Sequence, residues 1–94
     1  MQKCVRLTVR CCDQHQLAIL RALIENAAKK YDLEGTLYVR RPDQLQAIAA
    51  GSKDTVDQFI DQLHRDIHEE MQVAFEIEAA SKDRDYRGVF RIVE

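Results

Sequence analysis

The spacing of apolar residues alternates between two and about 3.6 positions along this chain, and this alternation constrains its fold more than any other feature. Apolar residues at every second position are typical of strands with one buried face, whereas apolar residues one helical turn apart are typical of amphipathic helices. The pattern predicts strands over residues 5–10, 36–39, 45–50, 71–77 and 86–93, and helices over residues 13–31 and 52–68.

Side chains that favour helix ends and turns stand at the boundaries of these segments. Asp13 and Ser52 are suited to cap the two helices at their N-termini, and Gln16 follows Asp13 at the spacing of a capping box. Gly35 is suited to the left-handed conformation or tight turn that would end the first helix. Pro42 predicts a turn between the two strands that follow. We therefore expect a hairpin between the two helices.

The order of these segments predicts a ferredoxin-like α+β fold, βαββαβ plus a C-terminal strand, with two helices packed on one face of a mainly antiparallel sheet. The chain has 94 residues, and 46% of them are hydrophobic, which suffices for one core without disulfides or metal. No linker or low-complexity segment interrupts the pattern. We expect a single domain over residues 1–94.

The charge and cysteine content favour a cytoplasmic protein. Fourteen basic residues nearly balance sixteen acidic ones, and the net charge of −2 argues against nucleic-acid binding. The odd set of Cys4, Cys11 and Cys12 favours reduced thiols. No segment has the length of apolar sequence that crosses a bilayer, so we expect no membrane partner. Nothing in the sequence predicts a cofactor.

Several local segments, in the same order and with similar spacing, resemble the acylphosphatase family. The segment Gln16–Arg21 resembles its Gln-Gly-x-Gly-Phe-Arg motif, Leu33–Leu37 its Leu-x-Gly-x-Val motif, Leu45–Gly51 its hairpin return strand, and Asp85–Ile92 its terminal Tyr-x-x-Phe-x-Ile strand. The resemblance implies a ferredoxin-like fold. It also implies hydrolysis of the carboxyl-phosphate bond of acyl phosphates, which requires a phosphate-binding loop, an arginine and a water-orienting asparagine.

Only part of that catalytic apparatus has a counterpart here. The resemblance makes Arg21 the phosphate-binding arginine, but Leu17 and Ile19 replace the two loop glycines. Val39 stands at the asparagine position, where its side chain cannot orient water and where its alternation with Leu37 predicts a core residue. We therefore expect a catalytically impaired descendant that binds a protein partner or a small anion, with an active acylphosphatase as the alternative.

The predicted anion-binding loop joins the first strand to the first helix. It comprises Cys12, Asp13, Gln14, His15 and Gln16. Backbone N–H groups at a helix N-terminus attract phosphate. If the helix begins at Asp13, however, the carboxylate of that residue would occupy the anion position and repel phosphate.

The same connection offers an alternative metal site. Two cysteines and a histidine, Cys11, Cys12 and His15, supply ligands that suit Cu(I) or Zn(II). Heavy-metal-associated domains share the ferredoxin-like plan, but their two cysteines are separated by two residues, whereas these are adjacent. Cysteines that pack as small hydrophobic residues are the favoured interpretation.

The sheet face without helices is predicted to carry several basic side chains. These are Arg6, Arg10, Arg40 and Arg91, and they lie alongside Tyr38, Ile48 and Val89. RNA-binding sheets of this topology stack bases on several aromatic residues, and here only Tyr38 is well placed. The pattern therefore favours contact with a protein partner, or a solvated face, over nucleic-acid binding.

Overall fold

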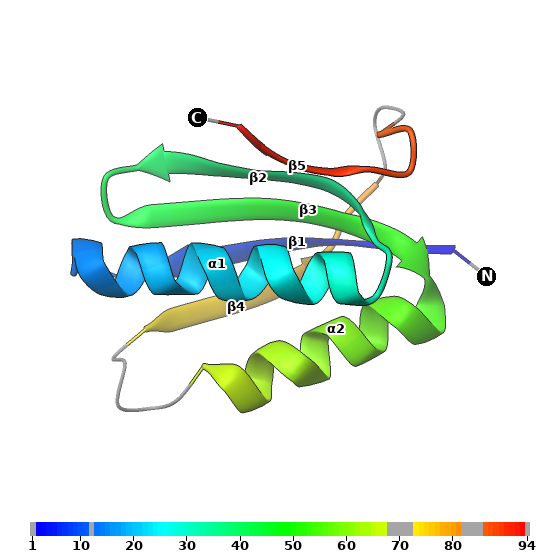
Figure 1. Ribbon diagram of the computed structural model, residues 1–94, viewed down its shortest axis with the longest axis horizontal. Coiled ribbons are helices and arrows are strands. Elements are labelled where there is room, and N and C mark those ends of the chain that lie inside the picture. The colour runs from blue at the N-terminus through cyan, green and yellow to red at the C-terminus, as the bar shows by residue number, and fades with distance from the viewer. Residues whose placement is uncertain (1, 12, 68–72, 82–85, 94) are drawn as a thin grey trace.

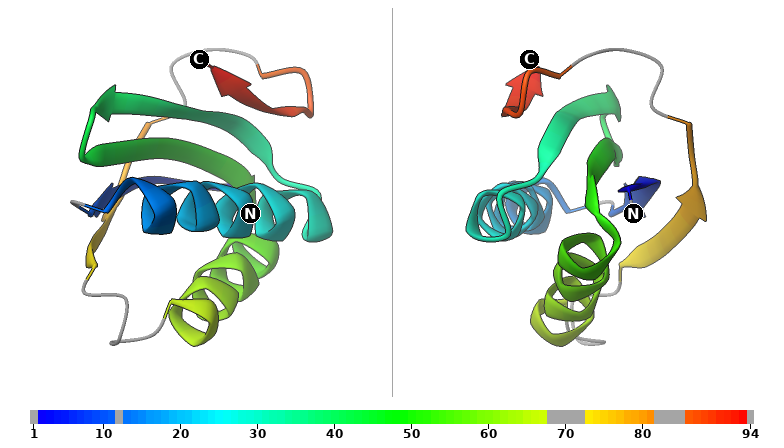
Figure 2. Two further views of the ribbon diagram at one scale, coloured as in Figure 1. Left: turned by 60° about the vertical axis from the view of Figure 1, so that its left-hand side comes forward. Right: turned by 90° about the vertical axis from the view of Figure 1, so that its right-hand side faces the viewer.

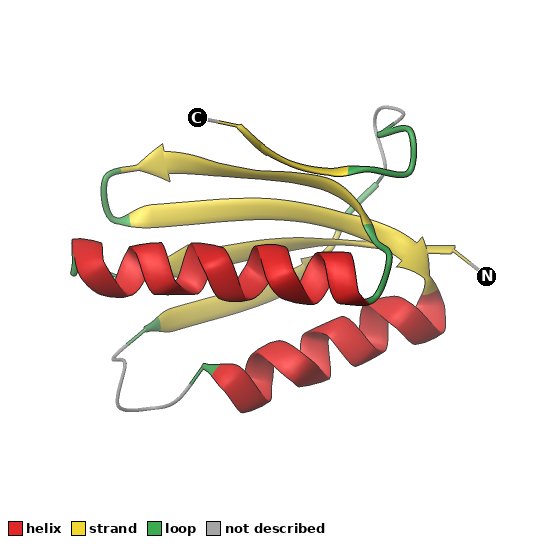
Figure 3. Cartoon of the chain, in the orientation of Figure 1, coloured by secondary structure: helices red, strands yellow, loops and turns green. Residues whose placement is uncertain are grey.

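A computed structural model describes residues 2–11, 13–67, 73–81 and 86–93, which form five strands and two helices (Figure 1). The elements are β1 (Gln2–Arg10), α1 (Gln14–Lys30), β2 (Glu34–Arg41), β3 (Gln44–Ser52), α2 (Lys53–Asp66), β4 (Ala74–Ala79) and β5 (Phe90–Val93). The sheet order is β4-β1-β3-β2-β5 (Figure 3). All neighbours are antiparallel except β2 and β5, which are parallel. The predicted ferredoxin-like α+β fold is confirmed.

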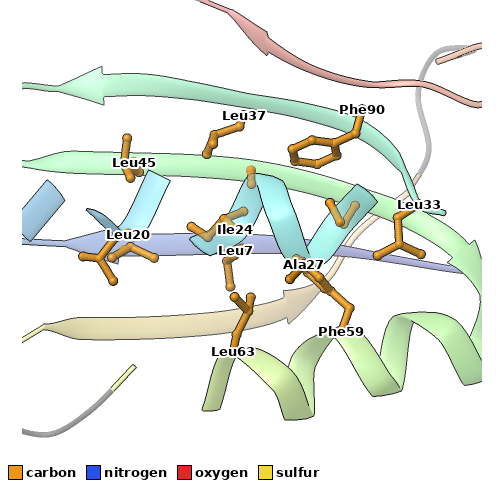
Figure 4. Packing of buried hydrophobic residues seen from close by; sticks show 14 of the residues in the cluster. Leu7, Leu20, Ile24, Ala27, Leu33, Leu37, Leu45, Phe59, Leu63 and Phe90 are labelled. Carbon is orange, nitrogen blue, oxygen red and sulfur yellow. The ribbon is translucent and has the colours of Figure 1, made fainter. Parts of the chain in front are cut away.

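Both helices cover the same face of the sheet (Figure 2). Their apolar stripes pack against the alternate residues of the strands that point to that face (Figure 4). Neither of the two described helices lies on the other face. The largest fully buried side chains are Phe59, Leu7, Leu20, Ile24, Leu37, Leu45, Leu63, Val9 and Val56. Burial of each such side chain stabilises the fold by about 1.5–3 kcal/mol. Neither described helix has the length and apolar character of a membrane-spanning helix.

The first helix has nearly the predicted extent, from its Asp13 N-cap to its Tyr31 C-cap, but the left-handed residue that follows it was not predicted. The carboxylate of Asp13 accepts hydrogen bonds from the backbone N–H groups of His15 and Gln16. At the other end Asp32 adopts a left-handed φ of 56°, and the Leu33 N–H donates to the carbonyl of Ala28 at 2.9 Å. This bond belongs to a Schellman motif.

Gly35 does not end the first helix, so that prediction was wrong. It lies inside β2 and has a φ of 148°. The left-handed residue is Asp32, whose short polar side chain tolerates this conformation better than most. The glycine instead allows β2 to pass close to β3.

The second helix begins where Ser52 was predicted to cap it, because the Ser52 hydroxyl accepts the Thr55 N–H at 3.2 Å. The helix ends at Asp66, with Ile67 as its C-cap. The prediction extended it to His68, which lies outside the described residues, as do residues 71 and 72 of the predicted strand 71–77. The described part of that strand is β4, in which Phe75 and Ile77 are half-buried.

The last strand is shorter than predicted. Residues 86–89 form a turn in which the Val89 N–H donates to the Tyr86 carbonyl at 3.1 Å. Arg87 and Gly88 both have positive φ values, 57° and 70°, as in a type I′ turn. The Gly88 N–H also donates to the Glu34 carboxylate at 2.8 Å. Pairing with β2 therefore begins only at residue 90.

Candidate functional site

Arg21 and Val39, which are 18 positions apart in the sequence, line one shallow hollow between α1 and the β2–β3 hairpin. This hairpin hollow has a volume of about 170 Å³. Its walls are Gln14, Leu17, Ala18, Arg21, Val39, Pro42 and Leu45. Arg21 is half-buried there. Arg21 and Val39, the position that resembles the family's asparagine, therefore line the same hollow.

Val39 is not a core residue, and that prediction was wrong. Its side chain is 48% exposed, although it lies on the same face of β2 as the buried Leu37. It lines the hairpin hollow instead of packing beneath the helix. The apolar side chain at this position still offers no hydrogen bond to water.

The residues that resemble the family's phosphate loop are helical. Residues 16–20 lie in the first two turns of α1, and the Leu17 N–H donates to the Asp13 carbonyl at 2.9 Å. The next N–H groups toward the N-terminus, those of His15 and Gln16, donate to the Asp13 carboxylate. These backbone donors are thus engaged by the chain itself, and a carboxylate lies at the helix N-terminus where an anion would bind.

Of the predicted anion-binding loop, Asp13 is the helix cap, and Gln14, His15 and Gln16 form the first turn of α1. Cys12 lies outside the described residues. The Gln14 side chain lines the hairpin hollow, and its Nε2 donates to the Pro42 carbonyl at 2.7 Å. This bond holds the start of α1 against the hairpin turn and places a carboxamide in the same hollow as Arg21.

The alternative metal site is only partly described, because Cys12 lies outside the described residues. Cys11 is buried, and its thiol donates to the Gln16 Oε1 at 3.4 Å and to the Asp13 carbonyl at 3.6 Å. His15 is exposed at the start of α1. Among the residues that the structure describes, no three His, Cys, Asp or Glu side chains come together to hold a metal ion. Metal binding at this connection stays a prediction.

The open sheet face carries a second and larger hollow. This sheet-face hollow has a volume of about 500 Å³. It is lined by Arg6, Thr36, Tyr38, Arg40, Gln46, Ile48, Ser81, Tyr86 and Val93. Arg10 and Arg91 extend the basic character of this face beyond it. Docking of a protein partner on this face stays a prediction.

Sequence reasoning placed the arginines and Tyr38 on the open face but missed Gln46, Ser81 and Tyr86. Gln46 occupies a polar position of an alternating strand, which normally indicates solvent exposure, yet only 6% of it is exposed. Its partners are Tyr38 on the other strand of the hairpin and Thr8 on β1, which is 38 positions away in the sequence. Ser81 follows β4 and Tyr86 precedes β5, and both line the hollow with residues of β1 and β2. A contact between such a connecting segment and the sheet leaves no periodic signal in the sequence.

Comparison with known proteins identifies the fold. No protein-family model matches the sequence, and no curated protein matches it. Among solved structures, an acylphosphatase from Coxiella burnetii is 19% identical over 98% of this chain and 93% of that one, with a TM-score of 0.74. An acylphosphatase from Bacillus subtilis is 16% identical over the full length of both chains, with a TM-score of 0.65.

A structure of full-length HypF in a phosphate- and nucleotide-bound form is 18% identical, with a TM-score of 0.81. All of this chain is covered by that match, but only 12% of the HypF chain is. Identities at this level establish a shared acylphosphatase-like fold. The resemblance stated from the sequence is confirmed at the level of the fold.

Proposed function

We propose that residues 1–94 form a single acylphosphatase-like domain that does not hydrolyse acyl phosphates and that binds a small anion beside Arg21. The observation that carries this proposal is the helical conformation of residues 16–20, whose counterparts in the family form the phosphate loop. A loop offers several convergent N–H groups to a phosphate, whereas successive N–H groups of a helix donate along its axis. The chain therefore keeps an arginine at the site but lacks the loop of convergent backbone N–H groups.

The absence of a water-orienting side chain at residue 39 supports the loss of catalysis. Hydrolysis of an acyl phosphate depends on placing water in line and on stabilising the charge that develops in the transition state. The Val39 side chain has no polar atom that could place the water. The amides of residues 16–20 are engaged in the helix and cannot stabilise the charge of the transition state. The Arg21 guanidinium can still pair with two oxygens of a bound oxyanion.

The match to HypF supports the choice of a small anion as ligand, because that protein's structure is described as phosphate- and nucleotide-bound. This chain spans only 12% of HypF, so HypF's ligands bear on this chain through the shared fold alone. The reduced thiol of Cys11 supports a cytoplasmic location for the domain.

The proposal is tested by incubating the purified protein with benzoyl phosphate and by titrating it with inorganic phosphate, followed by amide NMR. We expect no turnover, and we expect Arg21→Ala to weaken phosphate binding by about tenfold, the loss of one charged hydrogen-bonding group. Arg65→Ala is the matched control, because Arg65 is an exposed arginine of α2. Turnover that Arg21→Ala abolishes and Arg65→Ala retains would overturn the non-catalytic assignment.

The hydrolase alternative is favoured by one observation, the carboxamide of Gln14 in the hairpin hollow. Its nitrogen is held by the Pro42 carbonyl, so its oxygen is the atom that would accept a hydrogen bond from a water. If the protein does hydrolyse benzoyl phosphate, we expect Gln14→Leu to abolish turnover while phosphate still binds. A Gln14→Leu variant with full turnover would exclude this residue as the substitute for the asparagine.

A further inference from the structure

A buried glutamine organises the floor of the sheet-face hollow. The Gln46 Oε1 accepts hydrogen bonds from the Tyr38 hydroxyl and from the Arg40 Nη1, the latter at 3.3 Å. Its Nε2 donates to the Thr8 hydroxyl at 3.4 Å. Burial of a carboxamide costs free energy unless its polar atoms are paired, and here the pairing fixes the side chains of β1 and β2 around it. The hollow therefore has a polar floor that is formed before any ligand arrives.

Two guanidinium groups stand at this hollow. Arg40 uses one of its five N–H donors on Gln46, and Arg6 donates to the Glu78 carboxylate at 3.1 Å. No acidic side chain lines the hollow among the residues that the structure describes. Guanidinium groups bind phosphate oxygens through paired, charge-assisted hydrogen bonds. The electrostatic character of the hollow favours an anion.

The remaining walls combine one aromatic ring with aliphatic side chains. Tyr38 is half-buried, and Ile48 and Val93 add apolar surface beside it. Ser81 and Tyr86 bound the hollow from the segments that follow β4 and precede β5. Its volume of about 500 Å³ lies within the range of about 300–1,000 Å³ that is typical of small-molecule sites.

We propose that the sheet-face hollow binds a nucleoside monophosphate. The phosphate pairs with Arg40 and Arg6, and the base packs on Tyr38 against Ile48 and Val93. One aromatic platform suits one base, whereas an RNA strand needs several. This inference goes beyond the proposed function, because the hollow lies on the sheet face opposite the one that α1 and Arg21 cover.

The test is an amide NMR titration of the full chain with AMP, and with adenosine and inorganic phosphate as partial ligands. We expect saturable shifts at Tyr38, Gln46 and Ile48 with AMP, and weaker binding of either partial ligand. Arg40→Gln should weaken AMP binding by about tenfold, because a charged hydrogen-bonding group is lost. Arg10→Gln is the matched control, since Arg10 lies on the same face but does not line the hollow. We expect it to leave the affinity unchanged.

Tyr38→Leu separates recognition of the base from that of the phosphate. We expect it to reduce the affinity for AMP to that for inorganic phosphate. The proposal is overturned if AMP causes no saturable shifts in the hollow, if Arg40→Gln and Arg10→Gln weaken binding equally, or if a short oligouridylate binds more tightly than AMP. Arg21→Ala should leave AMP binding intact, so failure here is distinguishable from failure of the anion site beside Arg21.

Discussion

Gly35 on β2 lies directly against the backbone of Ile48 on β3. A Cβ atom added at Gly35 would lie 1.7 Å from the Ile48 carbonyl oxygen, which is far inside van der Waals contact. The contact involves backbone rather than the end of a flexible side chain, so rotation of a side chain cannot relieve it. This close approach lies where β2 pairs with β3 on one side and begins to pair with β5 on the other.

We predict that Gly35→Ala destabilises the protein by at least about 3 kcal/mol, because steric overlap is added to an unfavourable φ of 148°. Gly88→Ala is the matched control. Gly88 also has a positive φ, 70°, but an added Cβ would meet nothing within 4 Å. We expect the control to cost only about 1 kcal/mol. Urea denaturation measures both variants, and equal losses would contradict the role assigned to the Ile48 contact.

We predict that Asp13→Ala destabilises the protein by about 1 kcal/mol, because two N–H groups at the start of α1 lose their acceptor. Asp13→Ser retains an oxygen at the cap and should cost less. Asp13→Ser should also strengthen phosphate binding, because a negative charge is removed from the helix N-terminus. NMR titration with phosphate measures this effect. Unchanged or weaker affinity in the serine variant would show that the Asp13 carboxylate does not oppose anion binding.

The Phe59 side chain is fully buried where α2 packs on the sheet (Figure 4). We predict that Phe59→Ala costs about 3–5 kcal/mol, the loss of buried apolar area plus the cavity that remains. Ile19→Ala is the control, because Ile19 is 42% exposed on α1. It should change stability by less than about 0.5 kcal/mol. Similar losses in the two variants would place the core elsewhere than between the helices and the sheet.

Asp57 connects the start of β1 to α2. Its carboxylate accepts hydrogen bonds from Lys3 at 2.7 Å and from Lys53 at 3.1 Å, and these bonds lower the pKa of Asp57 below its ordinary value of 3.8. The hydrogen bond to Asp57 in turn raises the pKa of Lys53 above 10.5. The stabilisation is therefore present between these pH values. It is lost as the pH falls through the lowered pKa of Asp57 or rises through the raised pKa of Lys53.

We predict that Asp57→Asn lowers the thermal midpoint at pH 7 and makes stability less dependent on pH below 3.8. Both differences from the parent protein should shrink at high salt, because the groups are partly exposed. Asp61→Asn removes the same charge from an exposed position of α2 and serves as the control. If stability falls with acid pH to the same extent in both variants, the pairing of Asp57 with Lys3 and Lys53 makes no measurable contribution to stability.

Local patterns were sufficient to predict most of the fold. The change of apolar spacing identified both helices and the succession of strands along the chain. Asp13 and Ser52 marked the helix starts correctly, because capping depends on backbone groups that are close in the sequence. The ends were less predictable. Asp32, and not Gly35, is the left-handed residue that terminates α1. The sequence showed that Gly35 tolerates a positive φ. It did not show that the close packing of β2 on β3 requires a glycine at this position.

The candidate sites depended on contacts between segments that are distant in the sequence. The resemblance assigned separate roles to Arg21 and to position 39, but only the packing of α1 on the hairpin revealed Val39 at the surface and Gln14 in the same hollow as Arg21. Gln46 is a polar residue in an alternating strand, and its burial follows from Thr8, Tyr38 and Arg40 on the strands beside it. Spacing along a chain determines which face of an element a side chain occupies. What surrounds that side chain is decided when the elements pack, because its neighbours come from other parts of the chain.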